Sequence, residues 1–202
     1  MSHYFIEDNS LTHNFKKIRY TFGGGDFIFT TDSGVFSKSG ADTATDILLQ
    51  NIPPLKGSIL DLGCGYGLIG IVLAKTYNLA LTQVDINGRA LEVTKMNCEA
   101  NKVLSEIIKS DCFGSVSGFF DTITLNPPIH AGKNVTYKMY EQAAAHLNQG
   151  GRFYVVTLKK HGAETTREKL ADVFGNCETL YKKKGYYVFC CEKNTKDIGG
   201  TI

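Results

Sequence analysis

The sequence predicts an α/β fold with a mostly parallel, seven-stranded sheet and helices on both of its faces. Three observations lead to this prediction. From residue 58 onward, short apolar runs alternate with helical patterns, and a glycine-rich segment joins the first of these strands to the first helix. The third observation is a pair of strand-like segments around the turn Lys183-Lys184-Gly185. Apolar strands that alternate with helices are joined by right-handed crossovers, which build parallel sheets.

The expected elements follow one another in a regular order. Strands are expected at residues 58–62, 79–85, 106–109, 121–126 and 152–158. Helices are expected at residues 68–77, 89–100, 135–147 and 165–174. A shorter helix over residues 42–50 should end before Pro53-Pro54, because the residue before a proline is disfavoured in a helix. Residues 179–182 and 186–191 should form an antiparallel hairpin at the edge of the sheet.

A small hairpin is expected ahead of this region. Residues 15–22 and 27–31 are rich in aromatic and β-branched side chains, which favour strands. The glycines of Gly23-Gly-Gly-Asp26 supply the positive φ angles that a tight turn needs. The sequence therefore predicts an N-terminal extension with a β-hairpin over residues 1–31 and an α/β domain over residues 32–202.

Composition and charge are those of a soluble globular protein. The 202 residues are 43% hydrophobic and 21% charged, and so much apolar surface excludes a disordered chain. The formal net charge of +2 gives no overall attraction to nucleic acid. The charges are uneven, however. Residues 1–129 hold 10 Lys+Arg and 13 Asp+Glu, a net −3, whereas residues 130–202 hold 12 and 7, a net +5.

Several classes of protein are disfavoured. The longest apolar run, Leu68 to Ala74, is far shorter than the ~18 residues that span a bilayer. The N-terminus carries acids where a signal peptide has basic residues. The six cysteines form no Cys-x-x-Cys pair and no zinc spacing with the five histidines. We therefore expect reduced thiols, no metal site, no membrane contact and a cytoplasmic location.

A glycine-rich loop follows the first strand of the α/β region. Its sequence, Asp61-Leu-Gly63-Cys-Gly65-Tyr-Gly67, opens directly into a helix, and glycines there allow a sharp turn and a close approach to a ligand. Gly65-Tyr-Gly67-Leu-Ile-Gly70 also matches the dinucleotide fingerprint, with Asp85 about 20 residues further on. A nicotinamide-dependent oxidoreductase is therefore an alternative.

Asp61 disfavours that alternative. Its carboxylate would repel a pyrophosphate drawn to the helix N-terminus, and it suits a cationic ligand with an amino group or a sulfonium. Asp85 ends the second strand, where it is placed to accept hydrogen bonds from ribose hydroxyls in either case.

A second motif, Asn126-Pro127-Pro128, ends the strand at residues 121–126. The two prolines fix φ and stiffen the chain, which directs the Asn126 side-chain amide and the Pro127 carbonyl at one point. Two oxygen acceptors that hold the hydrogens of a planar exocyclic amine favour a pyramidal nitrogen, whose lone pair is then free for in-line attack on a methyl group. The motif therefore predicts stabilisation of transition-state geometry and not proton abstraction by a strong base.

With both motifs present in this order, residues 32–192 resemble the class I S-adenosylmethionine-dependent methyltransferases, which have a Rossmann-like fold. Asp61-Leu-Gly-Cys-Gly-Tyr-Gly67 is similar to the motif that holds the methionine end of the cofactor, and Asp85-Ile86 is similar to the ribose-binding strand end. Asp111-Cys112 stands where the family contacts adenine, and Asn126-Pro-Pro-Ile129 resembles the catalytic (Asn/Asp)-Pro-Pro-x motif of the amino-methylating branch.

This resemblance implies roles for individual residues. Asn126, Pro127 and Pro128 would be catalytic. The residues expected to bind S-adenosylmethionine are Asp61, Gly63, Cys64, Gly65, Gly67, Asp85, Ile86, Asp111, Cys112 and Asn126.

A closer resemblance is to the small-subunit ribosomal RNA guanine-N2 methyltransferases, in particular their single-domain bacterial members. It rests on Ser33-Gly-Val-Phe-Ser37, Asn126-Pro-Pro-Ile-His-Ala-Gly132 and Lys184-Gly-Tyr-Tyr-Val-Phe189. It implies methyl transfer to the exocyclic N2 amine of a guanine in 16S-type RNA, with ribosomal RNA or the small ribosomal subunit as the partner. The same chemistry on adenine N6 or on a protein glutamine amide is an alternative.

Substrate contacts are expected around the Asn-Pro-Pro motif. Many amino methyltransferases have an aromatic residue where this chain has Ile129, which offers an apolar wall but little stacking for a flipped base. A ring would then have to come from elsewhere in the chain. The candidates for that ring are Phe22, Phe36 and Tyr137.

Basic residues are further candidates for contact with RNA. His130 and Lys133 directly follow the catalytic motif, and Lys133 is placed to meet a phosphate. The stretches Lys159-Lys160-His161 and Lys182-Lys183-Lys184 flank strands of the basic carboxyl half, where they are candidates for contact with the RNA backbone. The substrate residues expected near the site are Phe36, Ile129, His130 and Lys133.

Overall fold

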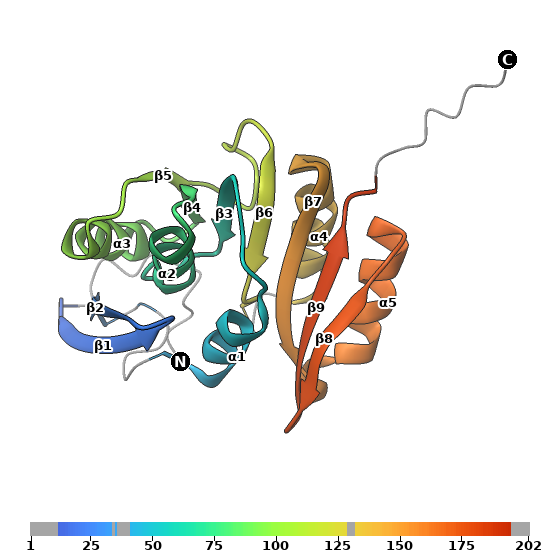
Figure 1. Cartoon of the computed structure of the whole chain (residues 1–202), viewed down its shortest axis with the longest axis horizontal. Helices are drawn as coiled ribbons and strands as arrows, with labels where there is room; N and C mark the ends of the chain where they lie inside the picture. Colours follow the sequence, from blue (N-terminus) through green and yellow to red (C-terminus); the bar gives the residue numbers. More distant parts are fainter. Residues whose placement is uncertain (1–11, 34, 36–40, 129–131, 195–202) are drawn as a thin grey trace, which may run out of the picture.

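A computed structural model describes residues 12–33, 35, 41–128 and 132–194 (Figure 1). Its centre is a seven-stranded sheet with the strand order β5-β4-β3-β6-β7-β9-β8. The strands are β3 (Ser58–Leu62), β4 (Ala80–Asp85), β5 (Ser105–Lys109), β6 (Phe120–Leu125), β7 (Leu147–Leu158), β8 (Glu178–Lys183) and β9 (Tyr186–Glu192). The first five strands of this set pair in parallel, and β9 and β8 pair antiparallel at one edge. The predicted architecture is therefore confirmed, including its edge hairpin.

Helices cover both faces of the sheet. They are α1 (Thr43–Asn51), α2 (Leu68–Tyr77), α3 (Gly88–Asn101), α4 (Lys133–His146) and α5 (Ala163–Phe174), with a short 3-10 turn, η1 (Lys159–His161). Buried residues of α1, α2 and α3 belong to one apolar cluster, whereas those of α4 and α5 belong to a second cluster. Adjacent Cys190 and Cys191 on β9 belong to different clusters, as alternation along a strand requires, and all six cysteines are free.

Strand β7 is longer than the sequence predicts, because it begins at Leu147 and not at residue 152. The extra residues are held by backbone pairing. Gly150 N donates to Lys193 O at 2.8 Å, and Lys193 N donates to Gly151 O at 2.9 Å. Leu147 also pairs with Phe120, after which the register shifts. Gly150 and Gly151 are therefore part of the sheet.

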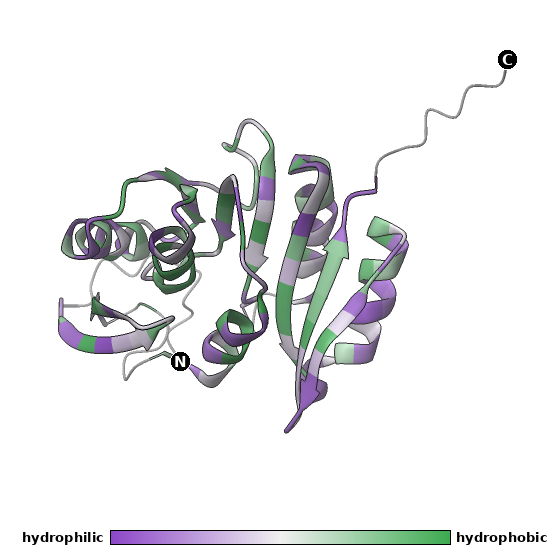
Figure 2. Ribbon diagram, viewed as in Figure 1, coloured by the Kyte–Doolittle hydropathy of each residue, from purple (hydrophilic) through white to green (hydrophobic). Residues whose placement is uncertain are grey.

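The N-terminal hairpin is confirmed as β1 (Lys16–Phe22) and β2 (Gly25–Thr31), which pair antiparallel as a separate two-stranded sheet. In Figure 2, β1 alternates between hydrophilic and hydrophobic residues, as expected for a strand with one face in water. Phe27 and Phe29 of β2 are buried in the same cluster as α1, α2 and α3. The boundary between residues 31 and 32 remains a prediction.

The hairpin is attached to α3 by two asparagines. Asn97 exchanges hydrogen bonds with the backbone of Thr30, at 2.6 and 2.9 Å, and Asn101 does the same with Ile28, at 3.1 and 2.7 Å. The two side chains lie one helical turn apart, and they bind the backbone of two residues that point the same way along β2. They therefore provide hydrogen-bond partners for a strand edge that would otherwise have none.

The parallel strands bring their carboxyl ends to one edge of the sheet. The glycine-rich loop follows β3, Asp85 ends β4, Asp111 follows β5, and Asn126 follows β6. Doubly wound sheets bind their ligands at this edge. No helix in the described part of the chain has the length and apolar character needed to cross a membrane.

Candidate active site

A cavity of about 1180 Å³ lies at the carboxyl edge of the parallel strands. Most of the residues predicted to form the site line it. These are Gly63, Cys64, Gly65, Asp85, Ile86, Asp111, Cys112, Asn126, Pro127, Pro128 and Lys133. The two motifs that lie more than fifty residues apart in the sequence therefore face one space.

Gly63 and Gly65 shape the floor of this cavity. Both have positive φ angles, of 66° and 59°, which favour glycine. A Cβ atom built on Gly65 would meet nothing within 4 Å, and one built on Gly63 would meet only Leu125, at 4.0 Å. These two positions are therefore kept open on the side where a ligand would lie.

Gly67 does not line the cavity, unlike Gly63 and Gly65, and its role in cofactor binding stays a prediction. It is the N-cap of α2 with φ 86°, and a Cβ there would lie 2.8 Å from Gln83 Nε2. Gly70 resembles it, since a Cβ there would lie 2.8 Å from Leu81 Cδ1. Both glycines allow α2 to pack closely on the sheet.

Asp61 also lies behind the loop and not in the cavity. Its side chain is buried, with the residue 1% exposed. Its carboxylate accepts hydrogen bonds from Gly70 N at 2.9 Å and from Thr124 Oγ1 at 3.0 Å. Burial raises its pKa to about 7. Asp61 therefore caps the first turn of α2 from behind the loop, and the expected suitability of its carboxylate for a cationic ligand stays a prediction.

Asp85 is placed as predicted, at the cavity wall where β4 ends. Its carboxylate accepts hydrogen bonds from Gly65 N and Asn87 N, both at 2.9 Å. Burial raises its pKa. A carboxylate has about four acceptor positions, so Asp85 keeps capacity for ligand hydroxyls. The neighbouring Ile86 is 43% exposed and presents an apolar surface to the cavity.

The loop after β5 supplies the next wall. Ser110, Asp111 and Cys112 line the cavity, and Cys112 is buried with a positive φ of 51°. Asp111 pairs with Lys138 of α4 at 3.0 Å, and this hydrogen bond lowers the pKa of Asp111. The ion pair links the loop to α4 across the wall.

The orientation of Asn126 is determined by the start of α1. Its Nδ2 atom donates to Thr45 Oγ1 at 2.9 Å and to Asp42 Oδ2 at 3.3 Å. The Thr45 hydroxyl donates in turn to Asp42 Oδ2 at 2.6 Å. A carboxylate only accepts hydrogen bonds, so the amide group of Asn126 must face Asp42. No described residue donates to Asn126 Oδ1, which is left as an acceptor for a ligand.

Sequence reasoning missed Asp42 and Thr45, although both line the cavity. Asp42 is the N-cap of α1 and accepts hydrogen bonds from Ala44 N and Thr45 N, at 2.8 and 3.1 Å. The available signal was Asp42 at the predicted start of the helix, but that pattern indicates a cap and not a neighbour of Asn126.

The structure describes only one of the four predicted substrate residues. Phe36, Ile129 and His130 lie outside the described residues. Lys133 begins α4, is exposed and lines the cavity. Of the candidate aromatic rings, Tyr137 lines the cavity, whereas Phe22 packs against the apolar cluster beside α2 and does not. Tyr186, which was not a candidate for stacking, also lines it.

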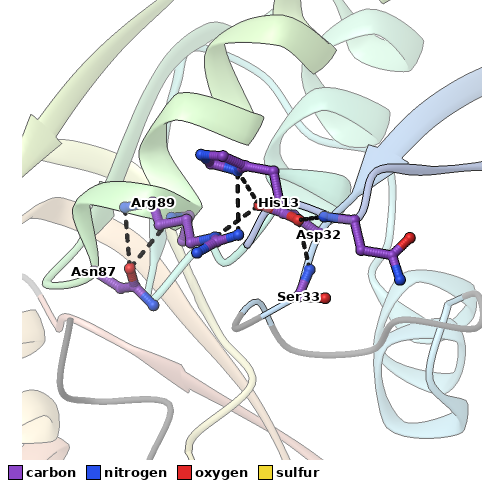
Figure 3. A network of polar contacts seen from close by, with 7 residues as sticks. His13, Asp32, Ser33, Asn87 and Arg89 are labelled. Carbon is purple, nitrogen blue, oxygen red and sulfur yellow. Dashed lines mark hydrogen bonds and ion pairs between the residues drawn. The ribbon is translucent and has the colours of Figure 1, made fainter. Parts of the chain in front are cut away.

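A polar network fixes the segment before Ser33 to the start of α3 (Figure 3). The buried carboxylate of Asp32 accepts hydrogen bonds from Arg89 Nε at 2.7 Å, Asn14 N at 2.7 Å and Ser33 N at 2.6 Å, and His13 Nδ1 lies 2.7 Å away. Burial would raise the pKa of Asp32, but these hydrogen bonds hold it well below its usual range. Arg89 follows Asn87, which caps α3 and lines the cavity.

The chain is similar in sequence to a known family and to individual proteins of it. Residues 26–190 match the family described as "Methyltransferase small domain". The chain is 39% identical over 197 residues to the uncharacterized protein YbxB of Bacillus subtilis, covering 95% of this chain and 98% of that protein. It is 42% identical over 129 residues to a ribosomal RNA small subunit methyltransferase C of Haemophilus influenzae, covering 61% of this chain and 39% of that protein.

A solved structure is similar over most of the chain. It is a 16S rRNA N2 methyltransferase of T. thermophilus in complex with AdoMet and guanosine, with a TM-score of 0.80 and 27% identity. The match covers 89% of this chain and 51% of that one. The chain thus spans about 39% and 51% of the two named ribosomal RNA methyltransferases, but nearly all of YbxB.

Proposed function

Because the chain belongs to the methyltransferase small domain family, we propose that it transfers a methyl group from S-adenosylmethionine to the exocyclic N2 amine of a guanine in small-subunit ribosomal RNA. The ribosomal RNA or the small subunit itself would be its partner. The names of two relatives support this substrate, since one is a small-subunit ribosomal RNA methyltransferase and the other an N2 methyltransferase in complex with guanosine. The proposal depends most on the orientation of the Asn126 side chain, whose Nδ2 atom faces Asp42 and Thr45.

The residues around the cavity fit S-adenosylmethionine. Because Gly63 and Gly65 have no side chain, the space beside the loop is open for a ligand. Asp85 retains acceptor positions for ribose hydroxyls, and the exposed face of Ile86 suits a planar apolar ring. Asp61 lies behind the loop, where its carboxyl holds Gly70 N in the first turn of α2 and so supports the shape of the loop. When bound, the cofactor supplies a methyl group on a sulfonium.

The chemistry of the chain's own residues matches an amine acceptor. Asn126 Oδ1 has no donor among the described residues, and the Pro127 carbonyl lies beside it in the sequence. Both oxygens would accept hydrogens from the target amine, which favours a pyramidal nitrogen with an available lone pair. Thr45 and Asp42 hold the Asn126 amide before the substrate arrives, so little reorganisation is needed.

A nicotinamide-dependent reaction is less compatible with the structure. A pyrophosphate at this loop would need the free N–H groups of the first turn of α2. Gly70 N in that turn already donates to the Asp61 carboxylate at 2.9 Å. An added pyrophosphate would compete with a buried anion for the same donors.

The test is transfer of tritiated methyl from S-adenosylmethionine to small ribosomal subunits isolated without their natural methylation. Nucleoside analysis should find the label in N2-methylguanosine. Label in N6-methyladenosine, or in a methylated glutamine of a ribosomal protein, would overturn the guanine assignment. Asn126→Ala should bind S-adenosylmethionine normally by calorimetry and lose at least about 100-fold in kcat, because one amine acceptor is gone.

A further inference from the structure

Two lysine-rich stretches that lie far apart in the sequence meet at one end of the sheet. Leu158, the last residue of β7, pairs with Tyr186, the first residue of β9, and Lys183 pairs with Tyr186 from the other side. Lys159 N of η1 donates to Gly185 O in the turn between β8 and β9, at 2.7 Å. Figure 1 shows this turn extending beyond the end of β7, and Figure 2 shows its hydrophilic tip.

We call the set Lys159, Lys160, Lys182, Lys183 and Lys184 the lysine surface. Its lysines are all exposed. It borders the candidate active site, because Lys160 and His161 of η1 and Tyr186 of β9 line the cavity. The same short elements therefore form part of the cavity wall and part of the charged surface outside it.

The charge of this surface is not balanced within the described chain. The side chains of Lys159, Lys160, Lys183 and Lys184 have no ion-pair partner among the residues that the structure describes. Lys182 approaches Glu164 at 3.4 Å, but Glu164 also pairs with Arg167 at 3.7 Å.

Several cations elsewhere on the molecule have acidic partners, although single exposed lysines such as Lys16, Lys56 and Lys95 have no ion pair in the described part of the chain. Lys138 pairs with Asp111, Lys169 with Glu141, and Arg152 with Glu192. Lysines that lie close together without acidic partners repel one another. A polyanionic partner would neutralise this repulsion, and the position of the cluster beside the cavity therefore indicates such a partner.

We propose that the lysine surface binds the phosphates of the RNA backbone next to the nucleotide that enters the cavity. The inference rests on the proposed function and names where the RNA lies during the reaction. A polyanion that crosses this edge would carry phosphates over η1 and the β8–β9 turn while one of its bases reaches the Asn126 loop. Phosphate contacts of this kind position a nucleic acid and supply most of its salt-dependent affinity.

The surface suits a nucleic acid better than a lipid membrane. The exposed large apolar side chains of the described chain include Phe15, Leu104 and Phe119, and none of them lies in η1 or in the β8–β9 turn. Binding at a membrane interface normally requires apolar side chains that insert below the headgroups. This surface offers charge without such side chains.

The test compares two triple variants of the full chain by fluorescence anisotropy with a labelled 16S ribosomal RNA transcript, from 50 to 300 mM KCl. Lys159→Ala/Lys183→Ala/Lys184→Ala removes three charges of the lysine surface at positions that do not line the cavity. Lys16→Ala/Lys56→Ala/Lys95→Ala is the matched control, because it removes three exposed lysines that do not line the cavity.

The first variant should bind RNA at least about tenfold more weakly than the wild type at 150 mM salt. Its plot of log affinity against log salt should be shallower by about 2 to 3, since each lost phosphate contact removes roughly 0.7–0.9 from the slope. The control should bind like the wild type. Equal losses in both variants, or no loss in either, would overturn the proposal.

Kinetics separate this inference from the proposed function. If both hold, the first variant shows a raised KM for ribosomal RNA, a kcat within about twofold of the wild type, and unchanged binding of S-adenosylmethionine. If the wild type transfers the methyl group and the variant has the same KM for ribosomal RNA, the proposed role of the lysine surface is overturned and the proposed function is not. RNA binding that depends on the lysines, without any methyl transfer to guanine, would overturn the function alone. Lysine-dependent binding to phosphatidylglycerol vesicles without binding to RNA would also overturn the surface.

Discussion

Asn126 and Asp42 are separated by 84 positions in the sequence, yet the Asn126 amide donates to the Asp42 carboxylate at 3.3 Å. Asp42 therefore has two roles, since the same side chain caps α1 through Ala44 N and Thr45 N. The start of one helix thus determines the orientation of the side-chain amide of Asn126, a residue that follows β6. Motifs of this kind also occur with aspartate in place of asparagine, and the Asp42 contact explains why this chain carries the amide.

Asn126→Asp should lower kcat by about 100-fold, because the new carboxylate would face the carboxylate of Asp42 at hydrogen-bond distance. Adding Asp42→Asn should recover at least tenfold of this loss. Asparagine at position 42 still caps the helix, and its amide can donate to the new carboxylate. Methyl transfer at saturating substrate measures kcat, and calorimetry checks that cofactor affinity is unchanged.

The control for this rescue is Asn126→Ala, which removes the contact without adding a charge. Asp42→Asn should not improve that variant. If Asp42→Asn rescues both variants equally, or neither, the orienting role of Asp42 is refuted.

Two glycines of the loop should respond differently to the same substitution. Gly65→Ala places a Cβ in open space, so it should lower the free energy of unfolding only by the cost of its positive φ, about 1 kcal/mol. It should lower the affinity for S-adenosylmethionine at least tenfold. Gly70→Ala forces a Cβ to within 2.8 Å of Leu81, so it should cost about 1–3 kcal/mol of stability.

Urea unfolding and calorimetric titration with the cofactor distinguish the two effects. A Gly65→Ala variant that is as unstable as Gly70→Ala but binds the cofactor normally would contradict the placement of Gly65 beside the ligand.

The sequence predicts the sheet and its order of elements well, because crossover handedness and hydrophobic patterning leave few arrangements. It also identifies the two motifs that line the cavity. It does not reveal contacts between side chains and backbone in distant elements. Asn97 and Asn101, for example, have the spacing of an ordinary helix face, and only the position of β2 makes them its edge partners.

Asp61 shows a second reason for the limits of sequence reasoning. Its position at the end of β3 correctly indicates a carboxylate near the glycine-rich loop. The side chain nevertheless points below the loop, because β3 is covered on that face by α2, and it bonds Gly70 N. Alternation along a strand tells which residues share a face, but the loop beyond the strand decides which of them meets the ligand.

The buried carboxyl of Asp61 should make stability depend on pH. Its pKa is raised to about 7 by burial, so the folded protein holds this proton more tightly than the unfolded chain does. Its contribution to stability therefore falls as pH rises from about 4 to 7, by an amount on the order of 2–4 kcal/mol. Asp61→Asn removes this titration.

Urea unfolding of the wild type and Asp61→Asn at pH 4.5, 6 and 7.5 measures the difference. The stability of the wild type relative to the variant should decrease as pH rises. A difference that is constant with pH would show that Asp61 ionises normally in the folded protein. Asp121→Asn, measured also at pH 3, is a control of opposite sign, because the hydrogen bond from Ser58 N lowers the pKa of Asp121, and its contribution is lost as pH falls below about 4.

The Asp32 network should depend on Arg89 far more than on His13. Both side chains place a nitrogen 2.7 Å from the same oxygen, but the side chain of Arg89 is 13% exposed and that of His13 is 52% exposed. Water screens the exposed contact, so His13→Ala should cost less than about 1 kcal/mol at pH 7. Arg89→Ala leaves a buried carboxylate without its buried cation and should cost about 3 kcal/mol.

Acid should reduce the difference in free energy of unfolding between Arg89→Ala and the wild type. The pKa of Asp32 is lowered in the folded protein, so its stabilisation is complete above about pH 4 and is lost as pH falls further. Without Arg89, protonation of Asp32 relieves the unpaired charge, so the variant should lose less stability on acidification than the wild type. Urea unfolding at pH 7 and pH 3.5 measures this. If Arg89→Ala and His13→Ala cost the same at both pH values, burial does not decide the strength of these two contacts.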